Sequence, residues 1–180
     1  MKTQSRKFAN KEVRIWLDGL PHILATNEFS KTVVQCDATQ LREYVCAIEV
    51  RTITEPPMYG LLGGHFRPNP GQFSLSITIV EDKETLFRDT IALKGDSVYW
   101  RFPAEFAEST KASITRHKEM PCGHLEVCCA ASAEISSNQV IFSFLGEVLM
   151  TAVTRQLEAD EILDLVGRLS VMKSWNELKH

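Results

Sequence analysis

The 180-residue sequence contains no long hydrophobic run. Its longest apolar tract, from Val140 to Val153, is interrupted by a serine, a glycine and a glutamate. The tract is also shorter than the roughly 18 residues that a membrane-spanning helix requires. The basic N-terminal residues are not followed by an apolar segment, so we expect no secretory signal and no export. We therefore predict a protein of the cytoplasm that does not bind to membranes.

Positive and negative residues are also nearly balanced in number. The 20 lysines and arginines face 23 aspartates and glutamates, and the net charge of −3 gives no general attraction to nucleic acid. The N-terminal end is locally basic, with Lys2, Arg6, Lys7, Lys11 and Arg14. We expect residues 1–11 to form a solvated tail that frays. The alternative is an RNA- or ribosome-associated protein that uses this basic patch together with Lys111, Arg116 and Lys118.

The sequence also lacks the even, regularly spaced cysteines of a disulfide framework. It has five cysteines, which are Cys36, Cys46, Cys122, Cys128 and Cys129. An odd number without such spacing predicts reduced thiols. His117, Cys122, His124 and Cys128 lie within twelve residues, but along a strand the last two would be about 13 Å apart at roughly 3.3 Å per residue. We therefore predict no metal site and no cofactor.

One enzymatic alternative uses the thiol of Cys122. A thiolate there could act as a nucleophile, with His117 or His124 as the base. No family signature surrounds this cysteine, so an unreactive thiol in a turn is the favoured interpretation and no catalytic residue is assigned. The glycines of 60–64 lack the Lys-Ser/Thr ending that a phosphate-binding loop needs.

Alternation of apolar and polar residues predicts most of the chain to be strands. The expected strands cover 13–17, 45–54, 74–79, 85–93 and 98–102, with a hairpin formed by 125–134 and 139–145. Short links between successive strands favour antiparallel pairing, as a meander and hairpins. Residues 146–154 fit a strand and a helix equally well.

Two helices complete the prediction. Pro103 suits a first helical position, and acidic residues come early and basic residues late in a middle helix near 103–118. Apolar residues at three- and four-residue intervals predict an amphipathic C-terminal helix near 158–177. No repeat or interdomain linker is visible. The sequence predicts one α+β domain over residues 1–180, built mostly from antiparallel sheet.

The most distinctive segment is the stretch 55–72, which holds four of the nine glycines and four of the seven prolines. This composition predicts a long loop. Tyr59, His65, Phe66 and Arg67 would be its binding residues, because they combine aromatic faces with positive charge. A loop that folds back onto the sheet is the alternative. We predict a non-enzymatic binding module for an unknown protein or small ligand, with its partner surface on 55–72 and no prediction of oligomeric state.

Overall fold

The structure is a computed structural model that describes residues 1–25, 29–36, 41–82 and 85–171. Eight strands form one sheet in the order β1-β2-β4-β5-β8-β6-β3, and β7 pairs with the last residues of β8. The strands are β1 (Lys2–Lys7), β2 (Lys11–Leu17), β3 (Phe29–Val34), β4 (Tyr44–Thr52), β5 (Tyr59–Pro68), β6 (Phe73–Thr78), β7 (Val98–Trp100) and β8 (Gly123–Ala133). All pairs of strands are antiparallel except β6 with β8.

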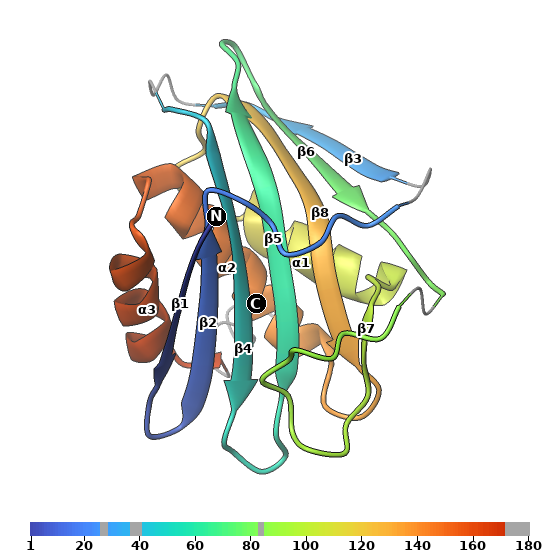
Figure 1. The fold of residues 1–180 in the computed structure, drawn as a ribbon. Helices are drawn as coiled ribbons and strands as arrows, with labels where there is room; N and C mark the ends of the chain where they lie inside the picture. Colours follow the sequence, from blue (N-terminus) through green and yellow to red (C-terminus); the bar gives the residue numbers. More distant parts are fainter. Residues whose placement is uncertain (26–28, 37–40, 83–84, 172–180) are drawn as a thin grey trace.

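Three helices cover one face of this sheet, here called the helix face (Figure 1). They are α1 (Ala104–Thr115), α2 (Gln139–Arg155) and α3 (Ala159–Arg168). Helix α2 packs against β5 and β4, and α3 packs against β2 and β1. Contact with α2 is close, because a Cβ atom on Gly60 would lie 2.9 Å from Leu145 Cδ1. On β4 the alternate residues Cys46, Ile48 and Val50 point to the helix face and are fully buried.

The opposite face, here called the open face, is covered only in part. Residues 18–25 cross it in front of β4, β5 and β8 (Figure 1), and the Leu24 amide donates to the Cys128 carbonyl at 2.8 Å. A second segment, 85–97, lies over the other end of β4 and β5, where Thr90 and Ile91 contact Glu49 (Figure 1). The remaining part is formed by β3, the first halves of β6 and β8, and the last residues of β5. We call this uncovered region the open end.

Several sequence-based predictions are confirmed. The α+β class is correct, and the strands predicted over 13–17, 45–54 and 74–79 correspond to β2, β4 and β6. The middle helix is α1, and the C-terminal prediction corresponds to α3 as far as Arg168. Residues 172–177 of that predicted helix lie outside the described residues.

The predicted meander and second hairpin are wrong. Residues 85–93 form a loop rather than a strand, and 139–145 begin α2, whose first turn is capped by the Asn138 side chain accepting from the Ile141 amide at 3.1 Å. The helix continues through 146–154. Because α2 is buried on most sides, its sequence lacks the polar face that marks a helix. Helix α1 then lies in the crossover that makes β6 and β8 parallel.

The segments predicted as a long loop and as a frayed tail both contain strands. Residues 59–68 form β5, a central strand between β4 and β8, so the long loop 55–72 is wrong. Its glycines permit close contact between strands: a Cβ atom on Gly63 would lie 2.5 Å from the Cβ of Ala47. The N-terminal segment is not a frayed tail, because residues 2–7 form β1 and pair with β2 along their whole length.

Candidate functional site

The four residues predicted to bind a partner are divided between the two faces of β5. Phe66 is 0% exposed on the helix face, and Tyr59 is 0% exposed on the open face, where its hydroxyl donates to Glu49 Oε1 at 2.7 Å. Both are therefore enclosed by the protein's own chain. His65 and Arg67 point to the open end and are accessible to solvent. Successive side chains of a strand point to opposite faces, which is why these four cannot form one surface.

His65 and Arg67 are each paired with an acidic side chain at the open end. His65 Nε2 contacts the carboxylate of Glu43, which precedes β4. Arg67 Nη1 lies 3.2 Å from Glu126 Oε2 on the neighbouring strand β8. The side chains of these pairs are partly or largely exposed, so each pair contributes little to stability and stays available to a ligand.

A histidine held by two serines lies next to these pairs. His124 of β8 is opposite Ser74 of β6, and its Nδ1 is 2.8 Å from the Ser74 hydroxyl while its Nε2 is 3.0 Å from the Ser76 hydroxyl. Burial lowers the pKa of His124, and the nearby positive charge of Arg67 acts in the same direction while Glu126 opposes it. The neutral ring therefore donates to one hydroxyl and accepts from the other.

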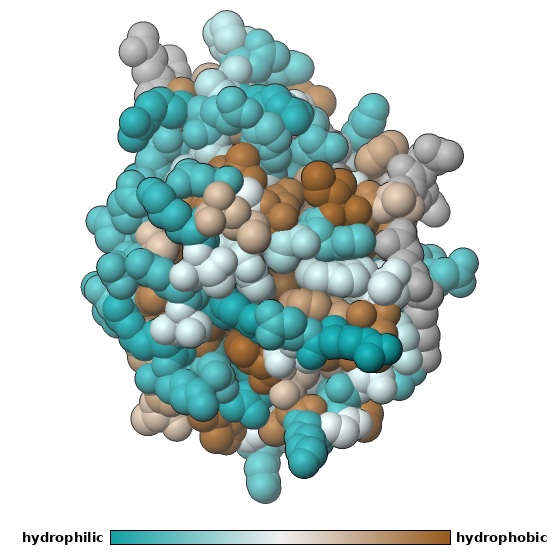
Figure 2. Space-filling model, in the orientation of Figure 1, coloured by the Kyte–Doolittle hydropathy of each residue, from teal (hydrophilic) through white to brown (hydrophobic). Residues whose placement is uncertain are grey.

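The outermost strand of the open end is β3. Within the described chain it pairs only with β6, so its other edge has no strand beside it. Phe29, Lys31 and Val33 point to the open face, since they lie opposite Thr78, Ser76 and Ser74. Phe29 is 46% exposed and Val33 is 62% exposed. Figure 2 shows the open face with hydrophobic and hydrophilic side chains intermixed.

A disulfide fixes the end of β3 to the start of β8. Cys36 and Cys122 are bonded, with their Cα atoms 5.2 Å apart, so the expectation that all five cysteines are reduced is wrong. The bond also leaves Cys122 without the free thiol that the enzymatic alternative needs. The other three cysteines are buried, and burial raises the pKa of Cys46 to about 12 and that of Cys128 to about 11. These thiols are therefore protonated and unreactive at neutral pH.

The basic N-terminal residues do not form a free cationic patch. Arg6 pairs with Asp160 and Asp164 of α3, at 3.0 Å and 2.5 Å. Lys11 is 1% exposed, and its Nζ donates to the last carbonyls of α3. The other three cations, Lys2, Lys7 and Arg14, pair with Asp18, Glu12 and Glu49. Lys11 and Arg14 are therefore withdrawn from solvent, whereas the exposed pairs of Lys2, Arg6 and Lys7 leave the RNA-binding alternative untested.

Sequence reasoning missed most residues of the open end. The alternation over 74–79 does indicate a polar face that contains Ser74 and Ser76. It gives no sign that this face continues across His124 and Glu126, because the parallel pairing of β6 with β8 joins residues about 50 positions apart. Lys31 joins this face through the antiparallel pairing of β3 with β6, which the local sequence pattern does not show.

Comparisons with known proteins add no relative: no family model matches the sequence, and no curated protein or solved structure is significantly similar to it. In the described part of the chain, no three or more histidine, cysteine, aspartate or glutamate side chains gather where they could hold a metal ion. No helix among the described residues is long and apolar enough to cross a membrane.

Proposed function

We propose that the protein is a binding module that takes an extended segment of another protein along the free edge of β3. The observation that carries this proposal is the difference between the two edges of the sheet. On β1 the side chains of Lys2, Arg6 and Lys7 are charged and paired with acids, which is how natural sheets protect an edge. β3 carries one charge and two exposed apolar side chains. Such an edge is the template for strand addition.

The side chains of β3 define the chemistry of the segment that fits. On the open face Phe29 and Val33 flank Lys31, so an added strand would face an apolar, a basic and again an apolar position. Cross-strand pairs are favourable between apolar residues and between opposite charges. The complementary segment therefore has an acidic residue with an apolar residue two positions away on each side.

A second copy of this chain fits the edge less well than a foreign segment. Antiparallel pairing of two copies centred on Lys31 would place this lysine directly opposite its equivalent. Like charges at that position destabilise a strand pair. The proposal is therefore a partner with an acidic segment, and self-association is an outcome that would contradict it.

The site is formed before any partner arrives. β3 is held by its pairing with β6 and by the bond between Cys36 and Cys122. Beside it no segment of the described chain covers the open end (Figure 1), and His65, Arg67 and His124 are accessible for side chains that extend beyond the added strand. A preformed surface lowers the entropic cost of binding. This supports a dedicated binding role for the edge.

The location in the cell stays a prediction. The sequence favours the cytoplasm, whereas structural disulfides are typical of oxidising compartments. Alkylation of the protein directly in cell extracts would distinguish these cases. Three reactive thiols after denaturation indicate that the Cys36–Cys122 bond exists in the cell, since three cysteines are free. Five reactive thiols support a reduced protein.

The proposed function is tested by selecting random 12-residue displayed peptides on the protein and measuring the affinity of those enriched. We expect alternating apolar and acidic residues, and chemical-shift changes that centre on β3. Val33→Lys should abolish binding, because a charge protects the edge. Ile135→Lys is the matched control, since Ile135 is 81% exposed just beyond the far end of β8. The proposal would be contradicted if the chemical-shift changes centred elsewhere or if both variants had equal effects. It would also be contradicted if the protein formed a dimer that Val33→Lys dissociates.

A further inference from the structure

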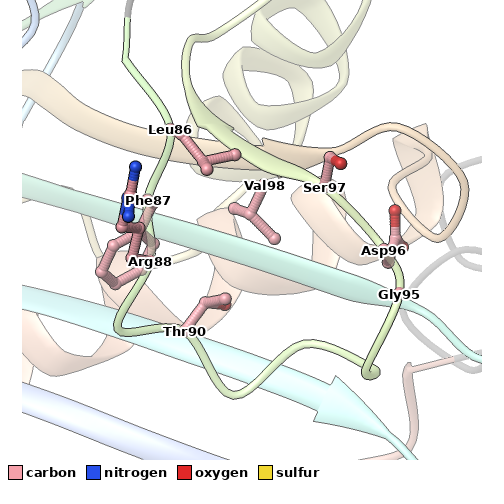
Figure 3. A pocket seen from close by; sticks show the side chains of 8 residues that line it. All are labelled: Leu86, Phe87, Arg88, Thr90, Gly95, Asp96, Ser97 and Val98. Carbon is pink, nitrogen blue, oxygen red and sulfur yellow. The ribbon is translucent and has the colours of Figure 1, made fainter.

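A separate feature of the open face is the loop formed by residues 85–98. Its two ends are held together, because the Phe87 amide donates to the Val98 carbonyl at 2.8 Å and the Trp100 amide donates to the Thr85 carbonyl at 2.9 Å. Between these ends the two sides of the loop separate and leave a hollow (Figure 3). Compact loops whose ends lie close together are frequently functional.

One side of the loop is anchored to a buried carboxylate on the sheet. Glu49 of β4 is 0% exposed, and its Oε1 accepts from the Thr90 hydroxyl at 2.9 Å and from the Ile91 amide at 3.1 Å. The same carboxylate accepts from Arg14 and from Tyr59. Arg14 in turn donates to the backbone carbonyl of Asp89 at 2.7 Å. The loop is thus fixed at three consecutive residues.

The other side of the loop is anchored through Asp96. Its carboxylate accepts from the Ile135 amide at 3.1 Å, from the Ser136 amide at 3.0 Å and from the Ser136 hydroxyl. Asp96 is therefore engaged with the chain after β8. Both sides of the hollow are held by hydrogen bonds to charged groups, which are the stronger class of hydrogen bond. The hollow is a preformed feature of the fold.

The lining of the hollow combines apolar and polar side chains and includes one cation. The cavity has a volume of about 340 Å³, which is within the range of small-ligand sites. Leu86, Phe87 and Val98 supply apolar walls, and Leu86 is 42% exposed. Arg88 also lines the hollow, and among the described residues no carboxylate pairs with its guanidinium. The lining therefore holds one guanidinium and one carboxylate. The Asp96 carboxylate is already occupied by neutral donors of residues 135 and 136, so Arg88 is the charged group that a ligand can engage.

We infer that this hollow binds a small ligand that carries one carboxylate and a short apolar body. The guanidinium of Arg88 matches a carboxylate with two parallel hydrogen bonds, and the apolar walls take the hydrocarbon part. This site is distinct from the β3 edge and does not depend on the proposed function. The carboxylate can belong to a free acid or to the C-terminus of a peptide.

The test is an NMR titration of the isotope-labelled protein with hexanoate and with hexanamide, its neutral analogue. We expect hexanoate to shift the resonances of residues 86–98 and hexanamide to bind about 10-fold to 100-fold more weakly, the range for a hydrogen bond to a charged group. A peptide ending in a free leucine carboxylate forms the second arm. If the peptide binds and hexanoate does not, the ligand is a protein C-terminus. If hexanoate binds, the ligand is a free acid.

Two variants make the assignment specific. Arg88→Met keeps the length of the side chain and should lower the affinity for the bound probe about 10-fold to 100-fold. Arg155→Met removes an exposed arginine at the end of α2 and should leave the affinity unchanged. The inference is overturned if no carboxylate probe binds, if the shifted resonances lie outside 86–98, or if Arg88→Met binds as tightly as the wild type. Val33→Lys should not change the affinity for the carboxylate probe, which shows that this site is independent of the β3 edge.

Discussion

Replacing Glu49 by leucine is the most informative perturbation of the fold. Glu49 is fully buried, and its side chain accepts hydrogen bonds from Arg14, Tyr59, Thr90 and the Ile91 amide at 2.7 to 3.1 Å. Burial raises the pKa of Glu49, and the Arg14 guanidinium and the three other donors oppose this rise. Glu49→Leu removes the acceptor of Tyr59, Thr90 and the Ile91 amide, and it leaves Arg14 with Asp89 alone. Arg14 is affected most, because its side chain is only 12% exposed.

The expected cost follows from breaking a buried ion pair while one partner remains. Such a change lowers the free energy of unfolding by about 3–5 kcal/mol. For a domain of about 150–250 residues, 1 kcal/mol shifts the melting temperature by about 2–4 °C, so we expect a decrease of about 6–20 °C. Urea denaturation followed by circular dichroism measures the free energy, and a thermal melt measures the shift.

A matched control uses the other carboxylate that contacts Arg14. The side chain of Asp89 lies 3.1 Å from Arg14 and is 93% exposed, so Asp89→Asn should cost no more than about 1 kcal/mol. The double variant Arg14→Met, Glu49→Leu should recover part of the loss, because no unpaired charge stays buried. If Glu49→Leu costs no more than Asp89→Asn, the buried carboxylate does not hold the 85–98 loop, and the reasoning is refuted.

Three further predictions test other parts of the structure. Lys11→Met keeps the apolar stem but leaves the last carbonyls of α3 without their donor, so the free energy of unfolding should fall by about 1–3 kcal/mol in urea denaturation; an unchanged value would contradict the buried contact. The pKa of His124 is lower in the folded protein than its usual 6.5, so its contribution to stability is present above pH 6.5 and is lost as the pH falls through the folded pKa. Thermal melts of the wild type and His124→Gln should therefore diverge as the pH rises toward 7, and parallel curves would contradict this shift. Cys36→Ser should lower the free energy of unfolding by about 2–5 kcal/mol under oxidising conditions and have no effect under reducing conditions, whereas equal effects in both would show that the disulfide is absent.

Local patterns in the sequence predict the strands that have one covered and one polar face. The alternation over 13–17, 45–54 and 74–79 identified β2, β4 and β6, because side chains of a strand alternate whatever its neighbours are. The pattern fails for α2, since its surroundings are apolar on nearly every side. It also cannot give the order of strands, which depends on pairs far apart in the chain.

The 55–72 segment shows why the candidate site could be predicted only in part. Its glycines indicate a loop when the chain is considered alone, whereas Gly60 and Gly63 are needed because α2 and β4 approach closely. These contacts join residues far apart in the chain, so the composition of the segment does not indicate them. Because the side chains of a strand point alternately to its two faces, His65 and Arg67 face the open end and Phe66 lies in the core. The short strand β3 has only six residues and no functional motif, so the sequence does not indicate a site there.

The most direct test of the central claim is hydrogen exchange of the β3 amides with and without a selected peptide. In the free protein the amides that point away from β6 have no strand to bond to, so they should exchange rapidly. Strand addition along β3 should slow the exchange of those amides within residues 29–34 and leave the exchange of β1 unchanged. Slowed exchange at β1 or on the helices, with the β3 amides unaffected by the bound peptide, would contradict the account.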